Sequence, residues 1–229
     1  MRLHGEGGLR LDASVVAIGA FDGVHRGHQS VIRQAVATAR ALGVPAVVYT
    51  FDPPPKAVFA GARVLTPIEE KLRRMAGLGV HHAVVAGFDR AYASRPAASF
   101  LDELSALHPA EVRVGADFRF GAGRAGDVTM LRRHFHVSVV DSVRCESGEI
   151  ISSTRIRNLI ARGDTGLASH LLGDRCPPGR TGISEGATAR ASKSSSSAAS
   201  DRTARRRYTS AGWPAANACL ELQTTTRSA

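Results

Sequence analysis

The sequence has few cysteines, few aromatic residues and no long apolar segment. Its cysteines are Cys145, Cys176 and Cys219, which are too few and too scattered for a disulfide framework or a CxxC metal site. Aromatic residues make up 5%, which leaves little material for stacking surfaces. No run of about 18 apolar residues occurs that would span a bilayer, and the first residues lack a signal peptide's apolar stretch. We therefore expect a cytoplasmic protein with inert thiols.

The rest of the composition is that of a folded protein with excess positive charge. Hydrophobic residues make up 43% and charged residues 22% of 229 residues, which is enough for one domain with an appendage or two small domains. The formal net charge of +10 favours an anionic partner, either a nucleotide or a nucleic acid. The GxxxxGK[ST] pattern is absent, which excludes a Walker-type phosphate loop.

The first half of the chain predicts a strand, a helix and a second strand. Ser14–Ile18 (SVVAI) is typical of a buried strand, and a glycine-rich loop follows it. From His28 onward, apolar residues fall on one helical stripe that ends at Gly43. Residues 44–51 predict the next buried strand. The prolines at 53–55 predict that no helix starts directly after that strand.

The alternation of helices and strands continues along the chain. Further helices are expected over 68–78, 97–107 and 128–135, and further strands over 82–86, 111–114 and 137–143. This order indicates an α/β fold with a parallel sheet flanked by helices on both faces. Ligands of such sheets bind at the carboxyl ends of the strands, where the glycine-rich loop is expected.

The loop from Gly19 to His28 reads GAFDGVHRGH. Its glycines let the backbone approach a ligand, and the positive end of the following helix favours phosphate. His25 and His28 stand three apart on an expected exposed polar loop, where both imidazoles can donate to phosphoryl oxygens as charge moves to a leaving pyrophosphate. Two surface histidines or an adventitious metal pair are the alternatives. No further Cys or His stands at zinc spacing, and the strand, loop and helix context favours the phosphate site.

A second polar motif, ISSTRIR, covers Ile151–Arg157. Its hydroxyls precede a helical pattern and therefore predict an N-cap, which accounts for them without any ligand. The hydroxyls, the free N–H groups of a helix start and an arginine are also donors for a triphosphate. Both interpretations remain open from these residues alone.

Four motifs in order resemble those of the bacterial bifunctional riboflavin kinase/FAD synthetase family, within the nucleotidyltransferase superfamily. Residues 19–28 resemble its GxFDGxHxGH, 50–55 (TFDPPP) its TFDPHP, 114–121 (VGADFRFG) its VGxDFRFG, and 151–157 its ISSTxIR. The resemblance covers residues 14–173 and implies a Rossmann-like nucleotidyltransferase domain. Pro54 stands where the family motif has histidine, so any polar contact of that histidine is missing.

The resemblance implies FMN adenylyltransferase (FAD synthetase) activity. The FMN phosphate attacks the α-phosphorus of ATP in line, FAD and pyrophosphate form, and Mg²⁺ accompanies ATP. The implied partners are the small molecules ATP and FMN, with no membrane and no specific nucleic acid. Positioning and charge stabilisation, rather than a protein nucleophile, are expected to provide most of the rate.

The resemblance also implies three sets of site residues. The catalytic set is His25, His28 and Arg157. The ATP-binding set is Gly19, Phe21, Asp22, Gly27, Ser153 and Thr154. The flavin-binding set is Pro53, Pro55, Phe59, Asp117 and Phe120. No residue is expected to ligate a metal. Phe118 and Phe120 are equally well explained as core residues.

Two domains are expected, an adenylyltransferase domain at 1–173 and a low-complexity tail at 174–229. The tail is rich in Ser, Ala, Gly, Thr and Arg, a composition typical of disorder. A riboflavin kinase domain with a G[FW]PTAN motif follows at this place in the resembling family. Only Gly212–Asn217 is similar to that motif, with Ala215 in place of its threonine, so riboflavin kinase activity is not expected.

Two other functions are compatible with parts of the sequence. A cytidylyltransferase-like enzyme acting on another phosphorylated substrate shares the first motif, although the TFDPxP and DFRFG segments oppose it. An inactive remnant that binds polyanions through basic residues such as Arg205–Arg207 is the second.

Overall fold

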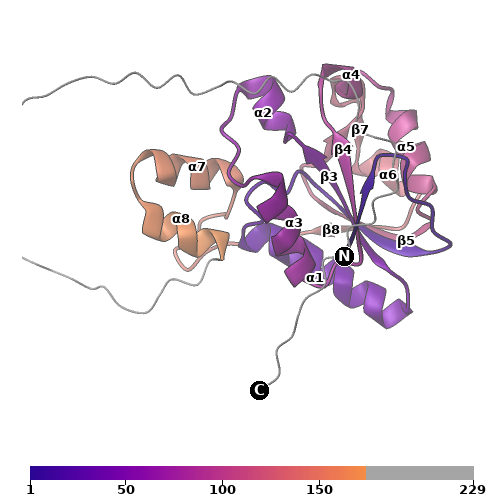
Figure 1. Cartoon of the computed structure of the whole chain (residues 1–229), viewed down its shortest axis with the longest axis horizontal. Coiled ribbons are helices and arrows are strands. Elements are labelled where there is room, and N and C mark those ends of the chain that lie inside the picture. Colours follow the sequence, from indigo (N-terminus) through magenta and orange to yellow (C-terminus); the bar gives the residue numbers. More distant parts are fainter. Residues whose placement is uncertain (174–229) are drawn as a thin grey trace, which may run out of the picture. The chain divides into compact units, whose positions relative to one another are not determined.

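In the computed structural model, which describes residues 1–173, a six-stranded parallel sheet organises the chain (Figure 1). The strand order is β1 (Arg2–Gly5), β4 (His82–Gly87), β3 (Ala46–Asp52), β2 (Ser14–Ile18), β5 (Pro109–Gly115) and β8 (Val137–Val140). From β2 the chain proceeds to β3 and β4 on one side and later to β5 and β8 on the other. The carboxyl end of β2 therefore lies where the winding direction reverses, which is the usual ligand position in such sheets.

Helices cover both faces of the sheet because its buried strands alternate their side chains. In β2, Val15 and Ala17 pack with α1 (Arg26–Leu42) and α3 (Ile68–Gly77). Val16 and Ile18 pack on the opposite face, with α5 (Ala97–Ser105) and α6 (Val128–Arg132) (Figure 1). The predicted parallel α/β class is confirmed, and strands buried on both faces explain the continuous apolar runs of the sequence.

The predicted end of the first long helix is confirmed. Gly43 has φ +66°, and its N–H donates to the Ala39 and Arg40 carbonyls, so it caps α1 in the left-handed conformation that glycine adopts without strain. Helix α1 connects the parallel strands β2 and β3 and therefore runs antiparallel to both over its 17 residues. Its first turn lies at the carboxyl edge of the sheet.

The expectation that the prolines exclude a helix after β3 is wrong. Helix α2 (Pro55–Ala60) begins at the last of them. Proline is tolerated in the first turn because its missing N–H has no helical partner there and its fixed φ is already helical. The sequence pattern also missed three short features: strand β1, helix α4 (Arg90–Ala93), and a hairpin of β6 (Arg119–Phe120) and β7 (Gly126–Asp127), whose strands flank the 3-10 turn Ala122–Arg124.

The last two described helices pack together beside the start of α1. Helices α7 (Ser153–Ala161) and α8 (Thr165–Leu172) share a small core that includes Ile156 and Leu171. The Gln29 side chain donates to the Leu172 carbonyl at 3.0 Å, which fastens α8 to α1. The predicted tail at 174–229 lies outside the described residues, and the predicted domain boundary after Gly173 stays a prediction.

Candidate functional site

The glycine-rich loop leaves the carboxyl end of β2 and leads into α1. Phe21 and Val24 have φ of 47° and 44°, in the left-handed region, and Gly23 has φ of 87°. The left-handed region costs a non-glycine residue roughly 1–2 kcal/mol, so such residues persist only where their surroundings hold them. A loop kept in this conformation has its N–H groups preset rather than free to turn.

The two histidines lie at the first turn of α1. His25 is the N-cap, and its Nδ1 accepts from the His28 N–H at 3.3 Å. The two rings stack with centroids 3.6 Å apart, and the Phe21 ring meets His28 edge-on. His25 is 4% exposed and His28 is partly buried, so the expectation of an exposed loop is wrong. The Nδ1 of His28 is buried without a hydrogen-bond partner, an arrangement that a ligand oxygen or water would satisfy.

Both imidazoles are neutral at pH 7. Burial lowers the pKa of His25 to about 4. Burial, then the neighbouring His25, then the ammonium of Lys71 lower the pKa of His28 well below its ordinary value. Neutral imidazoles carry one N–H donor and one acceptor nitrogen each.

Asp22 joins the glycine-rich loop to α7. It is 3% exposed, and one carboxylate oxygen accepts from the Leu65 and Thr66 N–H groups. The other oxygen is ion-paired with Arg157, whose Nε donates to the Arg63 carbonyl at 2.7 Å. Arg157 is therefore held in place, with N–H donors left over from its five.

The start of α7 lies directly beside this loop. Ser152 is the N-cap of α7, which confirms the predicted helix start. Ser153 Oγ donates to the Asp22 carbonyl at 2.9 Å across 131 residues of sequence. Thr154 is exposed, and its Oγ1 accepts from Lys56 Nζ at 3.1 Å. The two donor-rich motifs, the glycine-rich loop at 19–28 and ISSTRIR at 151–157, thus meet at one place. Lys56 of α2 is a cation at the same place that was not predicted from the sequence.

Gly27 has little room beside His25. A Cβ added at Gly27 would lie 3.1 Å from the His25 ring and 3.5 Å from the Ile151 carbonyl. At Gly19 an added Cβ would lie 2.9 Å from the Phe21 ring. Glycine at these two positions is therefore needed for close packing of the loop, in addition to any approach of a ligand.

The predicted flavin residues occupy two separate places. Pro53, Pro55 and Phe59 lie at the end of β3 and on α2, where Phe59 is 58% exposed. Asp117 is exposed before the β6 hairpin, whereas Phe120 is 7% exposed in the core.

An aromatic series runs through the core between these two places. Successive ring contacts with centroids 5.2–6.0 Å apart link Phe59, Phe88, Phe51, Tyr49, Phe100 and Phe120. Phe118 stacks on Phe120 at 5.8 Å. Phe120 therefore supports the core, and Phe59 offers the accessible ring.

Lys71 is the main residue of this region that sequence reasoning missed. It lies on α3, is 1% exposed, and donates to the Ala20 and Phe51 carbonyls and to Thr50 Oγ1. Its burial could have been predicted from its spacing in the sequence. Lys71 stands three residues after Ile68 and four before Met75, on the apolar stripe of its helix. Burial lowers its pKa to about 8, against the opposing effect of Asp52 and Asp22.

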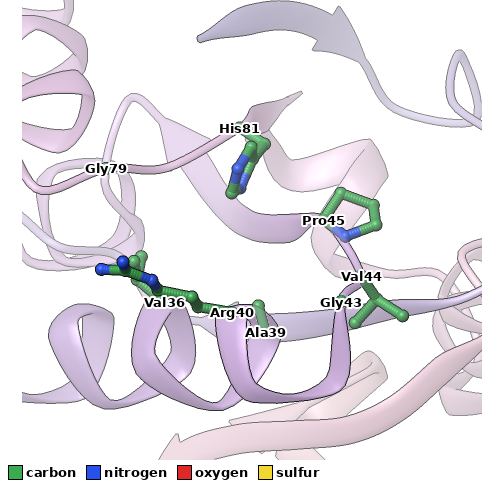
Figure 2. Close-up of a pocket in the computed structure, with 8 residues that line it drawn as sticks. All are labelled: Val36, Ala39, Arg40, Gly43, Val44, Pro45, Gly79 and His81. Atoms are coloured by element: carbon green, nitrogen blue, oxygen red, sulfur yellow. The ribbon is translucent and has the colours of Figure 1, made fainter.

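A hollow lies at the opposite edge of the sheet. Its volume is about 560 Å³, and it lies between the end of α1, the start of β3 and the segment before β4. Figure 2 shows His81 facing the α1 side chains across it. Its lining is mainly apolar and includes none of the predicted site residues.

Two kinds of feature are absent from residues 1–173. No group of three or more His, Cys, Asp or Glu there is arranged to hold a metal ion. No helix in the same range is both long and apolar enough to cross a bilayer.

Comparisons with a family model and with similar sequences point to one family. Residues 10–155 match the FAD synthetase family model. The chain is 58% identical over 174 residues to a Geobacillus thermodenitrificans protein described as a candidate bifunctional riboflavin kinase/FMN adenylyltransferase, covering 76% of this chain and 97% of that protein. It is 37% identical over 172 residues to the Escherichia coli K12 bifunctional riboflavin kinase/FMN adenylyltransferase, covering 71% of this chain and 55% of that protein. The match thus spans about half the length of the Escherichia coli relative.

A solved structure shares the fold. The crystal structure described as a macrolide-efflux protein from Streptococcus pneumoniae superposes with a TM-score of 0.67 at 31% identity. The superposition covers 75% of this chain and 61% of that chain.

Proposed function

The chain belongs to the FAD synthetase family, and from that premise we propose that it joins the AMP unit of ATP to FMN, giving FAD and pyrophosphate. The meeting of the two donor-rich motifs is the observation that carries the proposal, because Ser153 and Arg157 both bond to Asp22 of the glycine-rich loop. A cytidylyltransferase-like activity and an inactive remnant are not favoured by the family match.

The proposed reaction is one in-line displacement at the α-phosphorus of ATP. An oxygen of the FMN phosphate forms the new P–O bond while the bond from that phosphorus to the bridging oxygen breaks, and its electron pair leaves with pyrophosphate. Because phosphoryl transfer asks little covalent chemistry of a protein, donors placed around the phosphates are sufficient to catalyse it.

We propose that His25 and His28 donate to phosphate oxygens where negative charge grows. Their lowered pKa values keep both rings neutral, and the unpartnered Nδ1 of His28 supports a ligand contact there. We propose that the adenosine lies against the backbone of Gly19, Phe21 and Asp22, whose orientation is fixed by the loop conformation. Gly27 has no side chain and therefore leaves room for the His25 ring to pack against the loop.

Ser153, Thr154 and Arg157 are proposed to hold the triphosphate from the α7 side. Asp22 and the Arg63 carbonyl use two of the N–H directions of Arg157, which fixes its plane and leaves the other donors for phosphate. We add Lys56 as a second cation at this place, since its Nζ already lies 3.1 Å from Thr154 Oγ1.

The flavin is proposed to lie against Pro53, Pro55 and Phe59, with Asp117 at the other end of the aromatic series. Flat apolar surface suits the isoalloxazine rings, and the exposed Phe59 ring provides it. Phe120 is proposed to support the Asp117 end of the aromatic series through its packing in the core.

Magnesium is proposed to arrive with ATP as part of the substrate. Asp22 is already paired with Arg157, and among residues 1–173 no group of three or more His, Cys, Asp or Glu is arranged to hold a metal ion, which supports this proposal. Mg²⁺ commonly binds through substrate phosphates, where it supplies charge neutralisation.

The test is incubation of the purified chain with FMN, ATP and Mg²⁺, with FAD and pyrophosphate measured after chromatography. We expect equal amounts of both products, and no FMN in a parallel incubation with riboflavin and ATP. Replacing ATP by CTP, and FMN by other phosphorylated compounds, tests the cytidylyltransferase alternative. No FAD above background at high protein concentration would contradict the proposal.

A further inference from the structure

Lys71 is a buried cation behind the site. It is 1% exposed, and its Nζ donates to three neutral oxygens: the Phe51 carbonyl at 2.8 Å, Thr50 Oγ1 at 3.2 Å and the Ala20 carbonyl at 3.3 Å. Taking an ammonium out of water costs several kcal/mol, and an apolar side chain would fill the same space without that cost. The charge therefore calls for an explanation beyond core packing.

The three acceptors lie where two neighbouring strands separate. The last bond between β2 and β3 at this edge runs from the Gly19 N–H to the Tyr49 carbonyl at 3.1 Å. Phe51 is two residues further along β3, so its carbonyl points to the same side of the strand as the Tyr49 carbonyl. At Phe51 the chain that follows β2 no longer runs beside β3. Lys71 donates to that carbonyl in place of the missing strand.

The same ammonium reaches the glycine-rich loop through Ala20. Thr50 Oγ1 also donates to the Ala20 carbonyl, at 3.1 Å, so this carbonyl is held from two sides. In a trans peptide the C=O and the following N–H point in opposite directions, so fixing the Ala20 carbonyl turns the Phe21 N–H away from α3. This helps to hold Phe21 at its left-handed φ of 47°.

The charge of Lys71 also acts on the site. It contributes, after burial and His25, to lowering the pKa of His28. A cation close enough to act on that imidazole also attracts phosphate charge near it, more strongly in a partly buried site than in water.

We propose that Lys71 is a positioning residue for adenylyl transfer, whose ammonium holds the glycine-rich loop and the end of β3 in one fixed relation. The loop is the part proposed to contact ATP, and β3 leads into the part proposed to contact the flavin. The inference rests on the proposed function, since it concerns the relative placement of the two substrates.

The first test replaces Lys71 by methionine, which keeps an unbranched chain and removes the ammonium. We expect kcat/KM for FAD formation to fall about 10²-fold, the usual size for a displacement of about 1 Å at a reacting centre. The matched control is Met75→Leu, one turn further along α3 and fully buried without bonds to the loops, for which we expect native kcat/KM.

The second test uses pH and separates positioning from folding. Burial lowers the pKa of Lys71 to about 8, while Asp52 of β3 and Asp22 of the loop oppose this, and His28 of α1 faces the same region. We expect kcat/KM of the native chain to fall between pH 7 and 9.5 as the ammonium loses its proton. The unfolding free energy should rise over that range, because a lysine whose folded pKa is lowered is less costly to bury once neutral.

Lys71→Arg completes the second test. A guanidinium keeps its proton over this range, so the alkaline fall should be absent in the variant, at whatever level its activity stands. A purely structural role of Lys71 would leave the pH profile of activity the same in both proteins.

The outcomes separate this inference from the proposed function. If kcat/KM of the native chain is flat from pH 7 to 9.5, the inference is overturned even where neither variant folds. A folded Lys71→Met variant with native kcat/KM also overturns it. So does a Lys71→Arg variant whose kcat/KM falls at alkaline pH as in the native chain. Absence of FAD formation by the unchanged chain overturns the proposed function and, with it, the inference.

Discussion

At the scale of single residues, His28 gives the most direct test of the proposed chemistry. We expect His28→Ala to lower kcat for FAD formation about 10²–10³-fold, the usual effect of removing one transition-state donor. Stability should fall by about 1 kcal/mol, because the variant loses the stacking on His25 and the edge contact with Phe21. Steady-state kinetics and thermal unfolding measure the two effects. His136→Ala, at an exposed histidine, is the control, and native turnover of His28→Ala would remove His28 from the mechanism.

Asp22 is expected to matter more for stability than its place in a loop suggests. Asp22→Asn sets an amide donor against the Arg157 guanidinium in a nearly buried pair, and breaking such a pair typically costs about 3–5 kcal/mol. Denaturant unfolding followed by circular dichroism measures the loss. Asp117→Asn, at an exposed position, should change the unfolding free energy by less than about 0.5 kcal/mol. Equal unfolding midpoints for the two variants would show that the Asp22–Arg157 pair contributes little.

At the scale of elements, the first turn of α1 is predicted to be sensitive to one methyl group. In Gly27→Ala the new Cβ would lie 3.1 Å from the His25 ring, so the ring must shift and kcat should fall by about 10-fold or more. Gly166→Ala is the matched control, since Gly166 is also the second residue of its helix and an added Cβ there has nothing within 4 Å. The control should keep native activity and gain about 0.5–1 kcal/mol of stability. Native kcat in Gly27→Ala would show that the His25 ring position is not critical.

The main helices and strands were predictable because their apolar periodicity is set by the two-sided sheet. The stop at Gly43 and the cap at Ser152 were also predictable, since each follows from local conformation. Strand β1 has two exposed and two partly buried residues and therefore no clear pattern. Helix α2 was missed because three prolines in a row were interpreted as a barrier, although only the last of them stands inside the helix.

The site itself was predictable to a lesser degree. The motifs identify which residues gather, but the buried Asp22–Arg157 pair and the Lys71 bonds depend on how α3 and α7 cross the ends of β2 and β3. Such long-range crossings leave no local pattern in sequence. Phe120 illustrates the same limit, because its burial follows from the ring series and not from the motif that contains it.

At the scale of the whole molecule, stability is expected to fall on mild acidification. The folded pKa of His25 is lowered to about 4, so between about pH 6.5 and 4 the unfolded chain binds the proton that the folded chain excludes. The stability is fully present above pH 6.5 and is lost as pH falls, by about 2 kcal/mol at pH 5 from His25 alone. Burial also lowers the pKa values of His28 and His82, in the same direction. Denaturant unfolding at pH 7 and 5 measures the change. His25→Asn should reduce the difference, and equal native stability at both pH values would contradict the assignment.

Truncation after Gly173 tests how the activity is distributed along the chain. Every proposed site residue lies between Gly19 and Arg157, and the family match ends at residue 155. The last described contacts, the Gly173 cap of α8 and the bond from Gln29 to the Leu172 carbonyl, are kept by a stop after Gly173. We therefore expect kcat and the melting temperature to stay close to those of the full chain. Loss of the basic residues beyond 173, which include Arg205–Arg207, is expected to raise KM for ATP modestly at low salt, and added salt should remove that difference. A truncated chain that fails to fold, or that folds without forming FAD, would show that residues beyond 173 are required for the activity.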